Sequence, residues 1–211
     1  VPAPESAVIG EALTLYQTEL RKPSLTVWVL DTSGSMQGQP LAELKTAMGL
    51  LLDPDASAVN LLQPSSRDVT IILPFSSRAG RPLEVTGAEP GELQRAETYV
   101  ARLQADGGTD LYGAIMVALT QLKPYADEGT LFEYLPAIVA MTDGASNTDN
   151  RRKMLNALRQ SGFGLDVPIH SIAFGNADTA QLEELSNATV GRMFTAGDDL
   201  AKALRSAKGY N

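Results

Sequence analysis

Three short polar segments carry the residue types that could bind a metal ion. In the first, residues 31–35, an aspartate and two serines alternate, so a curled loop can aim all three side chains the same way. A glycine between the serines permits the tight turn. The second segment, residues 107–110, adds a threonine, and the third, residues 142–144, adds another aspartate. The five candidate ligands are Asp31, Ser33, Ser35, Thr109 and Asp143.

Two carboxylates and three hydroxyls form a set of hard oxygen ligands. Such ligands suit Mg²⁺, with Mn²⁺ or Ca²⁺ as alternatives, rather than zinc or copper. Two carboxylates roughly cancel the charge of a divalent ion, so the ion stays electrophilic enough to accept one more anionic ligand. The residue types therefore predict a site at which a metal ion links this chain to an acidic group.

The rest of the chain alternates apolar runs with helical patterns, which decides where the polar segments must lie. Apolar runs rich in β-forming residues are typical of strands buried on both faces. Their alternation with helices predicts one doubly wound α/β domain, in which ligands bind at the carboxyl ends of the strands. Expected strands are 25–30, 69–73, 82–85, 137–141, 169–174 and 192–195; expected helices are 11–21, 41–52, 93–103, 111–122 (ending before Pro124), 150–160, 179–186 and 198–207.

These motifs together resemble a known family. The sequence Asp-Thr-Ser-Gly-Ser-Met at 31–36, followed in order by Gly-Gly-Thr-Asp and Thr-Asp-Gly, is similar to the metal-ion-dependent adhesion site of von Willebrand factor type A domains. The resemblance covers about residues 24–207. It implies a mostly parallel six-stranded sheet in the order 3-2-1-4-5-6, with one short antiparallel edge strand and helices on both faces. It also implies direct metal ligation by Ser33 and Ser35, with Asp31, Thr109 and Asp143 binding directly or through water.

Composition narrows the class of partner. The net charge is −8 and there is no block of Lys or Arg, so neither nucleic acid nor anionic lipid is expected to bind. No apolar run approaches the roughly 20 residues of a membrane span, so membrane insertion is not expected either. The absence of cysteine excludes disulfides and thiol catalysis. We expect a monomer that binds a protein partner presenting Asp or Glu.

The ends of the chain suggest how the domain is arranged. Residues 1–23 are expected to form an N-terminal helix and linker, and residues 24–211 the metal-binding domain. The segment ALTLYQTELRKPS is similar to the junction in bacterial proteins that join a solute-binding domain to a C-terminal domain of this type. That similarity implies that residues 1–22 are a remnant of an upstream domain. It favours an extracytoplasmic location, periplasmic or at the cell surface, over the cytoplasm.

Three functions are compatible with these residues. The first is a metal-dependent binding module, with the loop 143–150 and the segment 76–87 forming a selective rim. The second is a phosphatase of the haloacid dehalogenase type, in which Asp31 would attack phosphorus. That class needs a second carboxylate two residues later, where this chain has Ser33, and a lysine near the rim that is not evident. The third is a scaffold domain whose metal is purely structural. We expect a binding module and not an enzyme.

Two further features are expected to be structural. His170, the only histidine, lies early in an expected strand, roughly 16 Å from the carboxyl edge at about 3.3 Å per residue, and is interpreted as a core residue. The sequence Asp53-Pro54-Asp55 resembles part of a calcium loop but lacks the later Gly and Glu. We interpret it as the end of a helix.

Overall fold

The computed structural model describes residues 15–16, 21–60, 62–175, 177–195, 201 and 204–208, which form a single six-stranded sheet with flanking helices. The strand order is β3-β2-β1-β4-β5-β6, and only the β2–β3 pair is antiparallel. This confirms the predicted doubly wound α/β fold and the order 3-2-1-4-5-6. The strands are β1 (Ser24–Asp31), β2 (Val69–Phe75), β3 (Leu83–Thr86), β4 (Leu135–Thr142), β5 (Ile169–Ala173) and β6 (Met193–Thr195).

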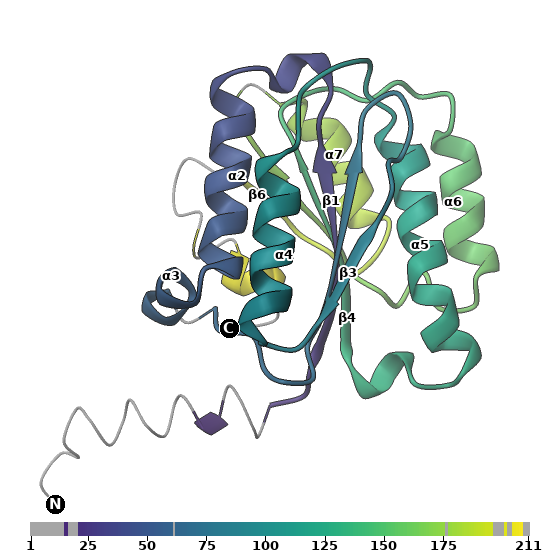
Figure 1. The fold of residues 1–211 in the computed structure, drawn as a ribbon. Coiled ribbons are helices and arrows are strands. Elements are labelled where there is room, and N and C mark those ends of the chain that lie inside the picture. The colour runs from purple at the N-terminus through teal and green to yellow at the C-terminus, as the bar shows by residue number, and fades with distance from the viewer. Residues whose placement is uncertain are drawn as a thin grey trace, which may run out of the picture.

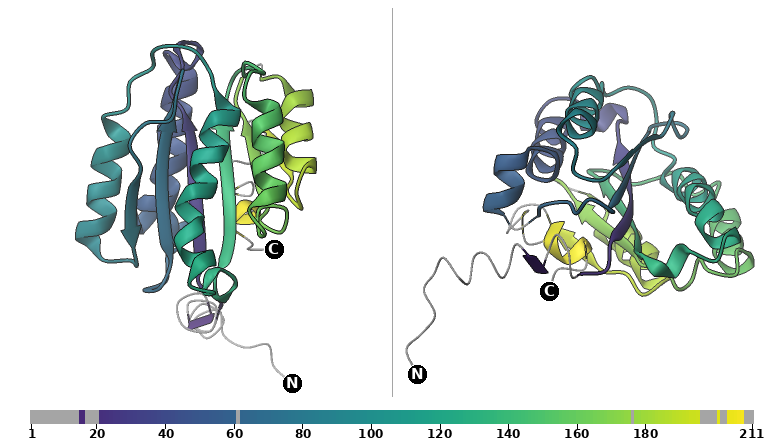
Figure 2. Two further views of the ribbon diagram at one scale, coloured as in Figure 1. Left: turned by 90° about the vertical axis from the view of Figure 1, so that its right-hand side faces the viewer. Right: turned by 60° about the horizontal axis from the view of Figure 1, so that its bottom comes forward.

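Helices cover both faces of the sheet (Figures 1 and 2). One apolar core joins the sheet to α5, α6 and α7, and a second joins the opposite face to α2, α4 and the helical residues 204–207. The helices are η2 (Gly34–Met36), α2 (Gln39–Leu52), α3 (Pro54–Val59), α4 (Pro90–Ala101), α5 (Leu111–Asp127), η3 (Leu131–Glu133), α6 (Arg151–Gln160) and α7 (Thr179–Asn187).

The central strand β1 shows how the sequence specifies burial on two sides. All eight of its residues are buried. Successive side chains of a strand point to opposite faces, and accordingly Val27 and Val29 belong to the core under α5, whereas Trp28 and Leu30 belong to the core under α2 and α4. Burial of an aliphatic side chain of this size contributes about 1.5–3 kcal/mol. The strand is thereby fixed in register, and Asp31 at its end is fixed with it.

Parallel pairing brings the polar segments to one edge. Leu30 of β1 pairs with Met141 of β4, so the next residues, Asp31 and Thr142, end these two strands side by side. On the other side of β1, Asp31 pairs with Phe75 at the end of β2. The loops that follow β1, β2 and β4 therefore start from adjacent points, as the sequence predicted.

One helix prediction was wrong at its end, and one short helix was missed. Helix α5 does not end before Pro124 but continues to Asp127. Proline removes one N–H and therefore one helical hydrogen bond, but here it lies in the last turn, where Lys123 also pairs with Asp127 at 2.6 Å. Helix α3 was not predicted; the Asp53 side chain caps it by accepting the Ala56 N–H at 2.7 Å. The interpretation of Asp53 as a helix end is confirmed, since it also follows the last residue of α2.

Other predictions fall on the base of the sheet or on the chain ends. His170 is buried, and its Nδ1 accepts the Arg192 N–H at 3.1 Å; burial lowers the pKa of this histidine. Its interpretation as a satisfied core residue is confirmed. The expected helices 11–21 and 198–207 lie mostly outside the described residues. Within the described part of the chain, no helix is both long and apolar enough to cross a membrane.

Candidate metal centre

The first polar segment begins where β1 ends, and neighbouring segments hold its backbone. Thr32 donates its N–H and its hydroxyl to the Phe75 carbonyl, at 2.7 and 2.8 Å. The Gly34 N–H donates to the Gly107 carbonyl at 2.9 Å, and a Cβ at position 34 would lie only 3.3 Å from that oxygen. Glycine at position 34 therefore lets the first and second polar segments approach closely.

Four of the five candidate ligands form one continuous hydrogen-bonded chain. The fully buried Asp31 accepts the Ser33 N–H on Oδ1 at 2.7 Å. The Ser33 and Ser35 hydroxyls lie 3.1 Å apart, and the Ser35 hydroxyl donates to Asp143 Oδ1 at 2.8 Å. The fold thus brings the first and third polar segments into direct contact at the carboxyl edge of the sheet.

The carboxylate of Asp31 is buried, and no cationic side chain among the described residues pairs with it. Its Oδ2 accepts the Thr142 hydroxyl. Burial raises the pKa of Asp31 and the negative charge of Asp143 adds to this effect, while the hydrogen bonds from Thr142 and Ser33 oppose it. No ion pair among the described residues includes Asp31 or Asp143. A charge in such a position is costly unless a cation approaches it.

Thr109 reaches the same edge from the second polar segment. The following residue, Asp110, donates its N–H to the Ser76 carbonyl at 2.8 Å and caps α5 by accepting the Gly113 N–H at 3.0 Å. The Thr109 carbonyl accepts the backbone N–H and the side-chain amide of Asn147, at 3.0 and 2.9 Å. The backbone makes these contacts, so the structure places Thr109 beside the hydrogen-bonded chain rather than within it.

Three residues that sequence reasoning missed support this arrangement. Thr142 donates to Asp31, and it was visible inside the Thr-Asp-Gly motif as a second polar residue at the end of β4. Ser146 lies in the loop 143–150, which continues the third polar segment and is counted with it from here on; its hydroxyl accepts the Leu111 N–H at 2.9 Å and so joins this segment to α5. Gln181 of α7 bonds to the backbone of Ser146, although no spacing pattern in the sequence points to it.

The predicted rim is only partly correct. Ser77 lies at the rim, since its hydroxyl accepts the Gly108 N–H at 2.7 Å. The chain then turns back as β3, antiparallel to β2, and the Gly87 N–H donates to the carbonyl of Asp68, the residue before β2. An antiparallel strand leads away from the edge where its predecessor ended. Most of the segment 76–87 therefore runs away from the candidate centre, and its end lies at the opposite edge.

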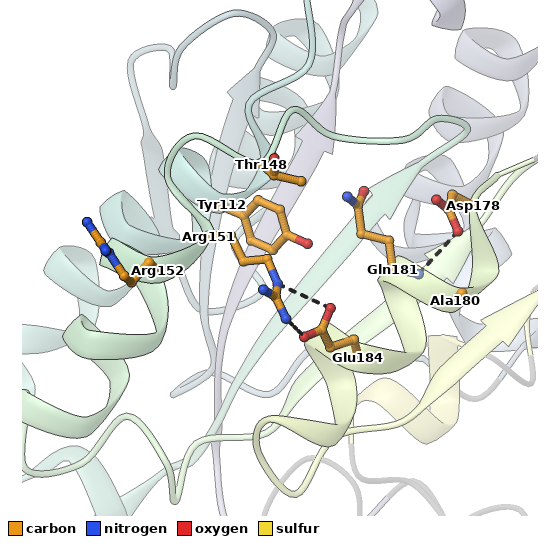
Figure 3. Close-up of a pocket in the computed structure, with 8 residues that line it drawn as sticks. All are labelled: Tyr112, Thr148, Arg151, Arg152, Asp178, Ala180, Gln181 and Glu184. Atoms are coloured by element: carbon orange, nitrogen blue, oxygen red, sulfur yellow. Dashed lines mark hydrogen bonds and ion pairs between the residues drawn. The ribbon is translucent and has the colours of Figure 1, made fainter.

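A groove of about 520 Å³ lies beside the third polar segment (Figure 3). The Arg151 guanidinium pairs directly with the Glu184 carboxylate in its lining, and both side chains are about half exposed. Such surface pairs contribute about 0–1 kcal/mol. Arg152 points away from the other labelled side chains (Figure 3). The lining residues are Tyr112, Thr148, Arg151, Arg152, Asp178, Ala180, Gln181 and Glu184.

The donor set at the edge is of the kind that hard divalent cations take. The described part of the chain holds no group of three or more His, Cys, Asp or Glu side chains placed to share a metal. A centre here would combine the two carboxylates of Asp31 and Asp143 with hydroxyl oxygens. The buried carboxylate of Asp31 lies next to a second carboxylate and has no ion pair within the described residues, and an ion bound there would offset this charge.

The fold and this oxygen-rich edge define a class of doubly wound α/β domains with a polar site at the carboxyl ends of the central strands. The chain belongs to the von Willebrand factor type A domain family, whose model matches residues 26–194. It is similar to inter-alpha-trypsin inhibitor heavy chain H6 of Homo sapiens, with 30% identity over 192 residues, and to heavy chain H4 of Sus scrofa, with 29% identity over 163 residues. These matches cover 85% and 69% of this chain but only 14% and 16% of those proteins.

Solved structures share the fold at low sequence identity. A von Willebrand factor type A protein from Catenulispora acidiphila has a TM-score of 0.66 at 19% identity, covering 90% of this chain and 43% of that one. The pilus adhesin SpaC from Lactobacillus rhamnosus GG has a TM-score of 0.61 at 15% identity, covering 92% and 30%. The PilB minor pilin from Streptococcus sanguinis, as a D319A mutant, has a TM-score of 0.60 at 12% identity, covering 90% and 60%.

Proposed function

We propose that this domain is a divalent-metal-dependent binding module that captures an acidic residue of a protein partner through the ion. The observation that carries the proposal is the fully buried Asp31 carboxylate, which has hydroxyl and amide partners, no ion pair within the described residues, and a second carboxylate nearby. Membership of the von Willebrand factor type A family supports a role in binding.

In this proposal the ion is Mg²⁺, with Mn²⁺ or Ca²⁺ able to replace it. Ser33 and Ser35 would bind it directly, because their hydroxyls lie 3.1 Å apart in the middle of the hydrogen-bonded chain, between Asp31 and Asp143. Asp31, Asp143 and Thr109 would bind it directly or through water. Bound there, the ion would supply a positive charge that polarises an incoming oxygen ligand.

The same set of ligands would leave a coordination position of the ion open for a partner. The protein offers at most five oxygen ligands, of which two carry charge, whereas Mg²⁺ takes six in octahedral geometry. An Asp or Glu of the partner would replace a water and meet an incompletely compensated cation. A charge-assisted contact of this kind is far stronger than a surface ion pair.

The metal site is tested by thermal unfolding with and without Mg²⁺ or Mn²⁺. We expect the melting temperature of the parent domain to rise with the ion and that of Ser33→Ala to lose this response. The control is Asp149→Asn, which removes an exposed carboxylate from the loop 143–150 that also carries Asp143. An unchanged metal response in Ser33→Ala would overturn the assignment.

An open ion is distinguished from a structural one by water exchange. We expect the Mn²⁺-loaded domain to enhance the relaxation of bulk water protons, and acetate to reduce that enhancement more than acetamide does at equal concentration. A tightly bound Mn²⁺ that leaves water relaxation unchanged would favour the scaffold function instead.

The phosphatase alternative has a separate test. Ser33 stands where that class needs its acid, and the described ion pairs bring no lysine to Asp31. We therefore expect no metal-dependent hydrolysis of p-nitrophenyl phosphate. Turnover that Asp31→Asn abolishes would replace the binding module with the enzyme.

We also propose an extracytoplasmic location and a protein partner. By their names, two proteins that share the fold are a pilus adhesin and a minor pilin, and such roles are compatible with this location. Localisation of the full-length protein by cell fractionation tests the assignment, and recovery in the cytoplasm alone would contradict it.

A further inference from the structure

We propose that Gln181 of α7 is a positioning residue of the candidate metal centre. Its amide clamps the third polar segment, so that Asp143 and Thr109 keep their places relative to each other. This inference rests on the proposed function and deepens it, because it names a residue outside the ligand set that controls the affinity of the site for the ion.

The clamp consists of two hydrogen bonds to a single residue. The Ser146 N–H donates to Gln181 Oε1 at 2.6 Å, and Gln181 Nε2 donates to the Ser146 carbonyl at 3.1 Å. Both polar groups of that residue's backbone are thereby satisfied by one side chain, as they would be by a neighbouring strand. Ser146 is buried and follows Asp143 by three positions, so the clamp fixes the loop close to its candidate ligand.

Ser146 passes this constraint to the second polar segment. Its hydroxyl accepts the Leu111 N–H at 2.9 Å and lies 3.3 Å from the Thr109 carbonyl. The next residue, Asn147, donates twice to that same carbonyl. The loop that carries Asp143 and the loop that carries Thr109 are therefore held together by adjacent residues, and Gln181 anchors both of them to α7.

Helix α7, which carries Gln181, is held in place by its own packing. Helix α7 packs through the buried Leu182 and Leu185, and its Ser186 hydroxyl bonds to that of Ser171 in β5 at 3.0 Å. The first polar segment depends on different contacts, since Thr32 bonds to the end of β2. Loss of the clamp is therefore expected to loosen two candidate ligands while the other three stay anchored.

The test is the affinity for Mn²⁺, measured by titration calorimetry on the intact chain. Gln181→Met keeps the length of the side chain and removes both hydrogen bonds. We expect it to weaken Mn²⁺ binding about 10-fold, the low end of the loss seen when outer-shell partners of metal ligands are removed. Gln181→Glu retains the acceptor for the Ser146 N–H and is expected to fall between the parent and Gln181→Met.

Two variants of the same helix serve as controls. Glu184→Gln breaks the ion pair with Arg151 and lines the same groove, but it leaves the clamp intact (Figure 3). Ser186→Ala weakens the packing of α7 on β5 without touching the polar segments. Both are expected to bind Mn²⁺ within two-fold of the parent, even where Ser186→Ala lowers the melting temperature as much as Gln181→Met does.

Amide hydrogen exchange separates this inference from the proposed function. In the metal-free protein, Gln181→Met is expected to accelerate exchange at the Ser146 and Asn147 N–H groups, and the controls are not. If the parent fails to bind Mn²⁺ but this acceleration occurs, the proposed function fails and the control of metal affinity fails with it, while the clamp of Gln181 on the loop stands. If exchange is unchanged, or if Ser186→Ala weakens Mn²⁺ binding as much as Gln181→Met, the positioning role is overturned.

Discussion

Two buried aspartates at opposite edges of the sheet have opposite environments. Asp31 ends β1 at the carboxyl edge, and Asp68 precedes β2 at the amino edge. Both are essentially inaccessible to solvent. Burial raises the pKa of Asp31 above its usual range. For Asp68 burial acts in the same direction, but the hydrogen bond from Arg21 and the charge of Lys208 outweigh it and lower the pKa.

The difference separates a structural carboxylate from a candidate ligand. Asp68 is enclosed by donors of the chain itself: the Arg21 guanidinium, the Ser24 N–H at 2.7 Å, the Ser65 N–H at 3.0 Å, and the Lys208 ammonium at 4.0 Å. Its charge is compensated internally. The site of Asp31 supplies no such compensation within the described residues, so a cation from solution would complete it. The two residues should therefore respond in opposite ways to the same substitution.

The largest effect is expected from Asp68→Asn. This change removes the negative charge with which the buried Arg21 and Lys208 both pair. An amide also offers one oxygen in place of two, so several of the donors around Asp68 lose their acceptor. Breaking a buried ion pair on one side typically costs about 3–5 kcal/mol. Urea unfolding of the two proteins measures the loss, and a change below about 1 kcal/mol would contradict the view that Asp68 is structural.

The buried Lys208, at the amino edge, is expected to make the free energy of unfolding depend on pH. Burial lowers the pKa of Lys208 from 10.5 to about 8, despite the opposing charge of Asp68. Between about pH 8 and 10.5 the unfolded chain binds more protons than the folded one, so the free energy of unfolding should rise with pH in this window. The expected gain is about 3 kcal/mol at most. Lys208→Met should remove the rise; an identical pH profile in that variant would contradict the assignment.

At the carboxyl edge, Asp31→Asn should not destabilise the metal-free protein, in contrast to Asp68→Asn. The Asn oxygen can accept the Ser33 N–H, its amide can donate to Thr142, and the costly buried charge is gone. We expect the free energy of unfolding to stay equal or to increase. The stabilisation by Mg²⁺, about 2.7 kcal/mol at 100 times the Kd, should disappear. Urea unfolding with and without Mg²⁺ measures both quantities, and a destabilised metal-free variant would remove the contrast with Asp68.

The fold could be predicted because its signals are local. In apolar runs such as residues 25–30, the residue types alone predict that the strand is buried. The alternation of these runs with helices predicts that the strands pair in parallel. The failures were also local. Pro124 was read as a helix terminator, although a proline in a last turn costs only one hydrogen bond. Helix α3 is too short for a recognisable period and depends on the cap at Asp53.

The proximity of the candidate ligands was predictable to the extent that these residues lie in compact motifs. Asp31, Ser33 and Ser35 are within five positions of each other, and Asp143 follows a strand that pairs with theirs. Gln181 could not be predicted, because its two bonds to Ser146 depend on how α7 lies against the third polar segment. The direction of the segment 76–87 was missed because β3 runs antiparallel to β2, so the segment ends at the opposite edge of the sheet.

The smallest change in the free energy of unfolding is expected from Thr109→Ala, at the same carboxyl edge of the sheet as Asp31. The contacts of Thr109 with the third polar segment use its carbonyl, which alanine retains, so the free energy of unfolding of the metal-free protein should change by less than about 0.5 kcal/mol. The hydroxyl, however, is the only candidate ligand from the second segment. Its loss should weaken binding of an acidic partner or of acetate to the Mn²⁺-loaded domain by about 10-fold, equivalent to about 1.4 kcal/mol.

Ser77→Ala, which removes a neighbouring hydroxyl that bonds to Gly108, is the matched control and should leave that binding unchanged. Water relaxation with acetate titration measures the loss; equal effects in both variants would mean that the second segment acts through its backbone alone.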